Sequence, residues 1–291
     1  MDVAILGCGY VGCELGRLLA DEGHDVVGVR RSDAGLRAIE EAGLTAVRAD
    51  VTDANSLATV PDADRVVFAA SAGGRDPVAA RRTYVDGLRT AIDAFADRDR
   101  PPERLIYTGS TGVYGDHAGA WVDESTPIEP ESERQRVLAA AERAAIERCG
   151  ERRIDGTVAR LAGLYGPGRY RIDRYLDGPV AEGYLNLVHR DDAAGAIAHL
   201  LENDLARGDV VLVVDDEPVS RWVLADWLAD QFGRASPEKR TTDDRLADPD
   251  IDADEHCVRA GKRCSNARLR SFGYEFVYPT FREGYQDAIV Q

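Results

Sequence analysis

Lysine is almost absent from this chain of 291 residues: Lys239 and Lys262 are the two lysines among 36 basic residues. Acidic residues number 52, so the net charge at pH 7 is −16. A nucleic-acid-binding surface needs a basic face for the phosphates, and the sequence offers none, so we expect no nucleic-acid partner. An acidic surface in which arginine replaces lysine indicates adaptation to high salt, where screening weakens the repulsion between like charges. A GC-rich genome would favour arginine in the same way.

Long apolar runs are also absent. No stretch approaches the length of a membrane span, so we expect no membrane partner. Residues 1–6 carry no basic region ahead of their apolar run, which argues against a secretory signal and predicts a cytoplasmic protein. Five cysteines are scattered without any metal-binding spacing. We therefore expect reduced, unpaired thiols and no metal site, and nothing beside Cys8 or Cys13 signals a lowered thiol pKa.

Apolar strands alternate with helical segments through the first 160 residues. We expect strands at 3–6, 25–29, 45–48, 65–70, 105–108 and 157–161, and helices at 14–21, 36–42, 84–96 and 134–148. This repetition predicts an α/β fold, a Rossmann doubly wound parallel sheet with right-handed crossovers.

The rest of the chain is less regular. We expect a loop at 163–184, a helix at 189–202, a strand at 210–214, and an exposed loop or mobile flap at 237–255. The sequence therefore predicts a Rossmann domain over 1–162 and a smaller, partly discontinuous substrate-binding region over 163–291. Residues from about 187 to 215 are expected to return to the Rossmann sheet.

A glycine motif follows the first expected strand and opens the first helix: Gly7, Gly9 and Gly12, with Tyr10 and Val11 between the last two. The glycines permit a tight turn, let the backbone approach a pyrophosphate, and let the helix pack on the strand. Amides at the helix N-terminus would then bind the phosphates. Because the motif opens a run of βαβ units, we interpret it as a dinucleotide-binding loop rather than a plain glycine turn.

The second expected strand ends in Arg30 and Arg31, with no carboxylate at that point. An acid there usually binds the ribose hydroxyls of NAD, whereas arginines accept the 2′-phosphate of NADP through charge-assisted hydrogen bonds. The adjacent pair favours NADP as the cofactor, with NAD as the alternative.

Further segments carry a wider resemblance. They are 49–53 (ADVTD), 69–72 (AASA), 107–115 (YTGSTGVYG), 160–168 (RLAGLYGPG) and 187–194 (LVHRDDAA). Together with the glycine loop they resemble the extended short-chain dehydrogenase/reductase family, in its epimerase/dehydratase branch, over most of the chain. The resemblance implies cofactor contacts for Asp50, Val51, Ala70 and Ser71. It also implies that Ser110 and Thr111 hydrogen-bond a substrate oxygen.

The resemblance breaks at the catalytic pair. In this family a Tyr-x-x-x-Lys pair opens the helix after the active-site loop; the tyrosine is the general acid/base, and the lysine lowers its pKa. The register set by residues 140–142 puts Arg134 at the tyrosine position and Leu138 at the lysine position. No tyrosine lies between Tyr114 and Tyr165. Arginine does not exchange a proton near neutral pH, so the family's usual proton transfer has no equivalent here.

Three functions stay open. An oxidoreductase, or an enzyme that modifies a sugar or sugar nucleotide, could use Ser110, Thr111 and Tyr114 in place of the missing pair, because hydride transfer is the chemistry of the cofactor. A non-catalytic NADP(H)-binding redox sensor or regulatory protein would need no acid/base. A scaffold without cofactor is the third, and the intact glycine loop argues against it. We favour the enzyme.

Basic residues late in the chain are candidates for binding a small, anionic substrate. Arg169 and Arg174 belong to one group, and Arg259, Lys262 and Arg263 form another. Internal salt bridges explain both groups equally well. We expect His189 to cap a helix rather than to relay protons. The resemblance also implies a homodimer through the helices at 84–96 and 134–148.

Overall fold

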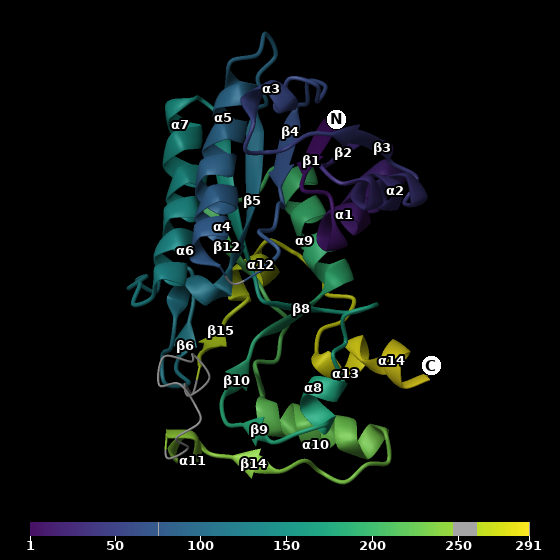
Figure 1. Ribbon diagram of the computed structural model, residues 1–291, viewed down its shortest axis with the longest axis vertical. Helices are drawn as coiled ribbons and strands as arrows, with labels where there is room; N and C mark the ends of the chain where they lie inside the picture. The colour runs from purple at the N-terminus through teal and green to yellow at the C-terminus, as the bar shows by residue number, and fades with distance from the viewer. Residues whose placement is uncertain (75, 247–260, 291) are drawn as a thin grey trace.

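The computed structural model of the protein describes residues 1–74, 76–246 and 261–290. Its central sheet contains β1 (Asp2–Leu6), β2 (Asp25–Arg30), β3 (Thr45–Arg48), β4 (Arg65–Phe68), β5 (Arg104–Ser110), β7 (Asp155–Leu161) and β12 (Asp209–Val213). All neighbours pair in parallel, in the order β12-β7-β5-β4-β1-β2-β3 (Figure 1). Strand order reverses between β1 and β4, as in doubly wound nucleotide-binding sheets. The predicted Rossmann fold class is confirmed.

Helices cover both faces of this sheet (Figure 1). One face carries α1 (Tyr10–Asp21), α2 (Asp33–Glu41), α9 (Arg190–Glu202) and α12 (Ala267–Ser271). The other carries α3 (Ala54–Leu57), α4 (Pro77–Arg81), α5 (Leu88–Ala96), α6 (Glu133–Arg143) and α7 (Cys149–Glu151). Wide π-helical turns at Arg82–Gly87 and Ala144–Arg148 join α4 to α5 and α6 to α7.

The apolar strand sequences follow from this layering. In β1, Val3 and Ile5 belong to the core under α1 and α9, whereas Ala4 and Leu6 belong to the core under α5. Successive side chains of a strand point to opposite faces, so a strand buried on both sides must be apolar throughout. This explains why these strands appear in the sequence as continuous apolar runs.

Two helices begin earlier than their apolar pattern predicts. The helical segment expected from residue 84 starts at α4, because Asp76 accepts hydrogen bonds from the amides of Val78 (3.0 Å) and Ala79 (3.3 Å) and Pro77 occupies the first helical position. The helix expected from residue 14 starts at Tyr10, since the glycine loop itself forms its first turn.

The C-terminal half adds short elements below the sheet in the view of Figure 1. They are β8 (Gly163–Tyr165), α8 (Asp173–Leu176), β9 (Val180–Ala181), β10 (Tyr184–Leu185), β11 (Leu187–His189), β13 (Val219–Ser220), α10 (Arg221–Gln231), β14 (Lys239–Arg240), α11 (Thr242–Leu246), β15 (Arg263–Cys264), α13 (Phe281–Gly284) and α14 (Gln286–Val290), with β6 (Trp121–Val122) from the N-terminal half. Several fall within the loop expected at 163–184, because strands of two or three residues carry no readable periodicity. Of the flap expected at 237–255, residues 247–255 lie outside the described chain.

A buried arginine ties β5 to the end of α9 and to the segment that follows it. Arg104 of β5 is fully buried, and its guanidinium donates to the carbonyl of Leu200 (2.7 Å), to the Thr157 hydroxyl (3.1 Å) and to the carbonyl of Leu205. Burial lowers its pKa to about 10. Carbonyl groups at the end of α9 and just after it therefore provide hydrogen-bond acceptors for the guanidinium that β5 places in the core.

Four thiols, Cys8, Cys13, Cys149 and Cys264, are free. In the described part of the chain no helix is long and apolar enough to cross a membrane. The same residues contain no cluster of His, Cys, Asp and Glu able to hold a metal ion.

Asp215, just beyond β12, is a buried carboxylate with incomplete hydrogen bonding. Its Oδ1 accepts from the Glu217 amide at 3.3 Å, and its Oδ2 has no partner among the described residues. Burial raises its pKa well above the usual range, and the nearby charges of Asp216, Glu217 and Asp192 add to the shift. A carboxyl whose pKa is raised by folding stabilises the protein at low pH and loses that contribution as pH rises through the folded-state pKa.

We therefore expect Asp215→Asn to become progressively more stable than the parent protein as pH rises from 5 to 8. Urea unfolding at each pH measures this difference. Asp216→Asn is the control. Burial would raise the pKa of Asp216, but hydrogen bonds from Arg270 and Asn266 bring it below the usual value. The stability difference between this variant and the parent protein should therefore not vary with pH from 5 to 8. A difference for Asp215→Asn that stays constant with pH would contradict the assignment.

Candidate functional site

A cleft of about 850 Å³ follows the carboxyl ends of β1, β2, β4 and β5. Open α/β sheets bind ligands at this position, where the strand order reverses. Its lining includes most of the residues predicted from the sequence: Gly7, Gly9, Tyr10, Val11, Gly12, Arg30, Arg31, Asp50, Val51, Ala70, Ser71, Ser110 and Arg169. Thr111, Tyr114 and Arg174 are not part of the lining.

The glycine loop lies tightly against two strand ends. Gly7 has a φ of +82°, and its amide donates to the Val29 carbonyl at 3.0 Å. A Cβ at Gly7 would overlap the backbone of Ala70 and come within 2.8 Å of the Ala69 carbonyl carbon. No described side chain caps α1, so the amides of its first turn stay open toward the cleft. This cradle fits a phosphate group.

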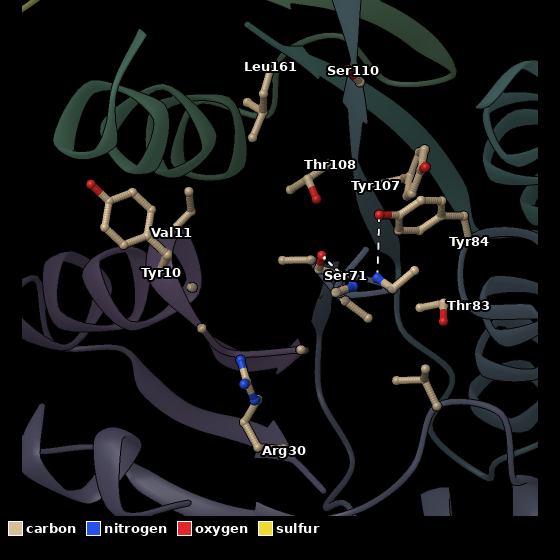
Figure 2. A pocket seen from close by; sticks show the side chains of 18 of the residues that line it. Tyr10, Val11, Arg30, Ser71, Thr83, Tyr84, Tyr107, Thr108, Ser110 and Leu161 are labelled. Carbon is tan, nitrogen blue, oxygen red and sulfur yellow. Dashed lines mark hydrogen bonds between the residues drawn. The ribbon is translucent and has the colours of Figure 1, made fainter. Parts of the chain in front are cut away.

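Arg30 lies across the outer side of the glycine loop (Figure 2). A Cβ at Gly9 would overlap its guanidinium, and a Cβ at Gly35 would lie 2.8 Å from its Nε. Arg30 forms no hydrogen bond or ion pair with any described residue. Arg31 is 75% exposed and lies 3.7 Å from Asp50.

Asp50 is held at the rim of the cleft as an ionised carboxylate. Its Oδ1 accepts from the Thr52 amide at 2.9 Å and from the Thr52 hydroxyl at 2.8 Å. These hydrogen bonds, the amide first, lower its pKa despite partial burial, and Arg31 and Arg82 act in the same direction. The carboxylate is therefore an acceptor at working pH.

The far end of the cleft carries Ser110, Arg134 and Leu138. Arg134 and Leu138, which the register of residues 140–142 puts at the positions of the family's tyrosine and lysine, thus lie on the cleft side of α6. The capping box of Ser132 and Gln135 fixes where this helix begins. Ser110 accepts a hydrogen bond from the Gly112 amide at 3.1 Å, which leaves its own proton available to a ligand.

Tyr114 and Thr111 lie away from this cleft. The Tyr114 hydroxyl donates to the Asp123 carbonyl at 2.6 Å and accepts from Arg160 at 2.5 Å. Burial raises the Tyr114 pKa, so the phenol is held as a neutral hydrogen-bonding group. Thr111 is buried at the start of the same 3₁₀ turn. Of the three catalytic candidates, only Ser110 faces the cleft.

Two cleft residues, Arg82 and Tyr84, are not found by sequence reasoning. Both stand on the wide turn between α4 and α5. The Tyr84 hydroxyl accepts a hydrogen bond from the Ala72 amide at 3.3 Å, drawn dashed in Figure 2, and its proton remains to be donated. No motif marks these residues. Asp76 and Pro77 are typical of a helix start, and a helix that begins there includes Arg82 and Tyr84.

The charge of the cleft is opposite to that of the protein. Arg30, Arg31, Arg82, Arg134 and Arg169 line it, with Asp50 as the one acidic residue among the described lining. Within the described chain, Arg31 is the one of these arginines that has a carboxylate within 4 Å. Since the chain carries a net charge of −16, unpaired guanidinium groups collected here indicate an anionic ligand.

Two basic residues near the C-terminus, Lys262 and Arg263, were candidates for binding an anionic substrate, and in the structure they bind the backbone of a loop. Lys262 donates to the Gly115 carbonyl at 3.2 Å, and Arg263 donates to the Gly119 carbonyl at 2.7 Å. Burial lowers the Lys262 pKa. Arg259 lies outside the described residues. These two cations thus fix the segment that follows Tyr114.

His189 caps α9, as the sequence suggested: its Nδ1 accepts from the Asp191 amide at 3.3 Å.

The two thiols beside the glycine loop differ from the expectation that neither has a lowered pKa. The Sγ atoms of Cys8 and Cys13 lie 3.9 Å apart, and the Cys8 thiol, as donor, lowers the Cys13 pKa. Sequence alone did not show this, because it depends on the turn of the glycine loop that brings Cys8 close to Cys13 in α1.

Comparison with known proteins agrees with this geometry. The model of the NAD-dependent epimerase/dehydratase family matches residues 3–213. Protein YeeZ of Escherichia coli K12 is 30% identical, with 95% of this chain and 96% of YeeZ covered. A Methylobacillus flagellatus structure classed with NAD-dependent epimerases/dehydratases is 30% identical, with a TM-score of 0.78 and 99% and 97% of the two chains covered. Human epimerase family protein SDR39U1, solved with NADPH, shares the fold at 17% identity, a TM-score of 0.78 and full coverage of both chains. The family model and the similar proteins give the same assignment as the fold: this chain belongs to the NAD-dependent epimerase/dehydratase family, whose members bind a nicotinamide dinucleotide.

Proposed function

We propose that this protein binds NADP(H) in the cleft and acts as an oxidoreductase, or as an enzyme that modifies a sugar or sugar nucleotide, on a small anionic substrate. The observation that carries the cofactor assignment is Arg30. Its guanidinium lies at the end of β2, beside the glycine loop and without a partner in the described chain. NADP differs from NAD by a phosphate on the adenosine ribose, and this is the position where an arginine accepts it.

The remaining groups divide the cleft into two parts. The open amides of α1 would hold the diphosphate, Asp50 and Val51 the adenosine, and the backbone at Ala70 and Ser71 the middle of the cofactor. The cofactor, when bound, supplies the hydride chemistry. Ser110 and Tyr84 each keep a hydroxyl proton for a substrate oxygen. Arg134, which replaces the family's tyrosine, would bind and orient an anionic group of the substrate rather than transfer a proton.

The test is a titration of the protein with NADPH and NADH, followed by nicotinamide fluorescence at fixed ionic strength. We expect NADPH to bind more tightly. Replacing both arginines (Arg30→Gln with Arg31→Gln) should raise the Kd for NADPH about 10- to 100-fold, the loss expected for one or two charge-assisted hydrogen bonds, and change the Kd for NADH less than about 3-fold. Arg174→Gln, outside the cleft, is the control. NADH affinity equal to or above NADPH affinity in the parent protein would overturn the assignment.

A second function rests on the missing acid/base pair: an NADP(H)-binding redox sensor or regulatory protein without turnover. A screen of carbonyl and sugar substrates under conditions of saturating NADPH separates the two. Turnover that is lost in Ser110→Ala with NADPH affinity retained supports the enzyme. Tight NADPH binding without turnover of any class supports the sensor.

We also propose where this protein works and that it pairs with a second copy. A net charge of −16 with free thiols suits a reduced, cytoplasmic and salt-rich environment. Pairing of two copies through α5 and α6 would give a homodimer, which sedimentation tests directly.

A further inference from the structure

Arg169 lies at the phosphate loop rather than beside the substrate end of the cleft. Its guanidinium carbon is 4.1 Å from the centre of the Tyr10 ring, and Tyr10 is the first residue of α1. In Figure 2, Tyr10 projects from the start of α1 on the side of the loop away from Arg30. Arg169 therefore contacts the residue that opens α1, and it lines the same cleft as the glycine loop.

The Arg169 guanidinium has no other partner among the described residues. A second arginine, Arg190, lies 5.6 Å from the same ring, but it donates to Asp191 at 2.7 Å and lies 3.6 Å from Glu14. Arg169 forms no hydrogen bond or ion pair with a described residue, although it is exposed and acidic residues are abundant. Stacking on an aromatic ring leaves the in-plane N–H donors of a guanidinium free, and Arg169 is one of the residues that line the cleft.

The backbone that carries Arg169 is held in place. The chain turns at Gly166 and Gly168, with φ values of +131° and +73°, and the Arg169 amide donates to the Gly166 carbonyl at 2.8 Å. On the other side, Tyr285 donates to the Tyr170 carbonyl at 3.0 Å. The position of Arg169 beside Tyr10 is thus set by the fold and not by a free loop.

We propose that Arg169 binds the diphosphate of the dinucleotide, with the Tyr10 ring as the surface that orients its guanidinium. This inference rests on the proposed function and deepens it. It replaces the substrate role that the sequence suggested for Arg169, and it gives the C-terminal half of the chain a direct contact with the cofactor. Because both NADP and NAD contain the diphosphate, Arg169 contributes equally to the affinity for each, unlike Arg30 and Arg31.

The experiment compares Kd values for NADPH and NADH in Arg169→Gln. We expect both Kd values to rise about 10-fold or more, and by the same factor. Arg174→Gln, from the same segment but outside the cleft, should leave both unchanged. Equal melting temperatures for the three proteins exclude a folding defect.

A double-mutant cycle tests the part played by Tyr10. Tyr10→Leu should raise both Kd values about 3-fold in the parent protein, and have no effect in the Arg169→Gln background, since the ring acts through the guanidinium. A loss confined to NADPH would place Arg169 at the 2′-phosphate, and unchanged Kd values would return it to the substrate; either result overturns the inference while the proposed function stands. If the parent protein binds neither dinucleotide, the proposed function fails and this inference fails with it.

Discussion

Replacing Gly7 by alanine should abolish binding of both NADPH and NADH and lower the free energy of unfolding by about 2–5 kcal/mol. About 1–2 kcal/mol comes from a side chain at positive φ, and about 1–3 kcal/mol from overpacking. The overpacking arises because the added Cβ would overlap the Ala70 backbone. Relief of that clash must move the loop or the segment that follows β4, and both line the cleft. Dinucleotide titration and urea unfolding of the variant measure the two effects.

Gly23 provides a matched control for this prediction. It has nearly the same φ, +83°, and an added Cβ there would meet nothing within 4 Å. Gly23→Ala should therefore show only the backbone cost, about 1–2 kcal/mol, with dinucleotide affinity unchanged. Equal losses in the two variants would mean that the close approach to Ala70 contributes nothing.

A buried ion pair behind the cleft gives the second large effect. Arg160 on β7 donates to Glu142 on α6 at 2.8 Å and 3.0 Å, and the two side chains are only 4% and 7% exposed. Burial raises the Glu142 pKa, although Arg160 opposes that shift. Glu142→Ala leaves the Arg160 charge in the core with the Tyr114 hydroxyl as its one remaining hydrogen-bond partner in the described part of the chain. We expect a loss of about 3–5 kcal/mol in the free energy of unfolding.

Two further variants make this prediction specific. Changing both partners together (Glu142→Leu with Arg160→Met) removes both charges and should recover most of the stability lost in Glu142→Ala. Glu133→Ala breaks an exposed pair with Arg136 on the same helix, 3.3 Å long, and should cost less than about 1 kcal/mol. If the double variant is no more stable than Glu142→Ala, lost packing rather than an unpaired charge explains the effect.

The cofactor half of the cleft could be predicted because its residues are local in sequence. A glycine loop between a strand and a helix has one common geometry, and the end of the next strand is necessarily beside it. Gly7, Gly9, Arg30 and Asp50 all line the cleft for this reason. Their contacts with a dinucleotide remain predictions.

The rest of the cleft could not be predicted, because it depends on side-chain directions that the local sequence does not encode. Tyr114 is four residues beyond Ser110, yet the 3₁₀ turn between them points its hydroxyl to Arg160 and away from the cleft. Arg169 and Arg174 share one segment, but the turns at two glycines bring only Arg169 to the cleft. Side-chain direction in such turns is set by tertiary contacts that no local pattern reports.

The placement of β12 has a consequence for how this protein is made. A ribosome releases β1 to β7 first, and at that stage β7 is an open sheet edge, while Arg104 lacks the carbonyls of Leu200 and Leu205. Unpaired edges recruit other chains, so this stage of translation is exposed to aggregation and calls for chaperones. β7 gains its neighbour only when β12 has emerged, so a gene fragment that stops after β7 should yield insoluble product.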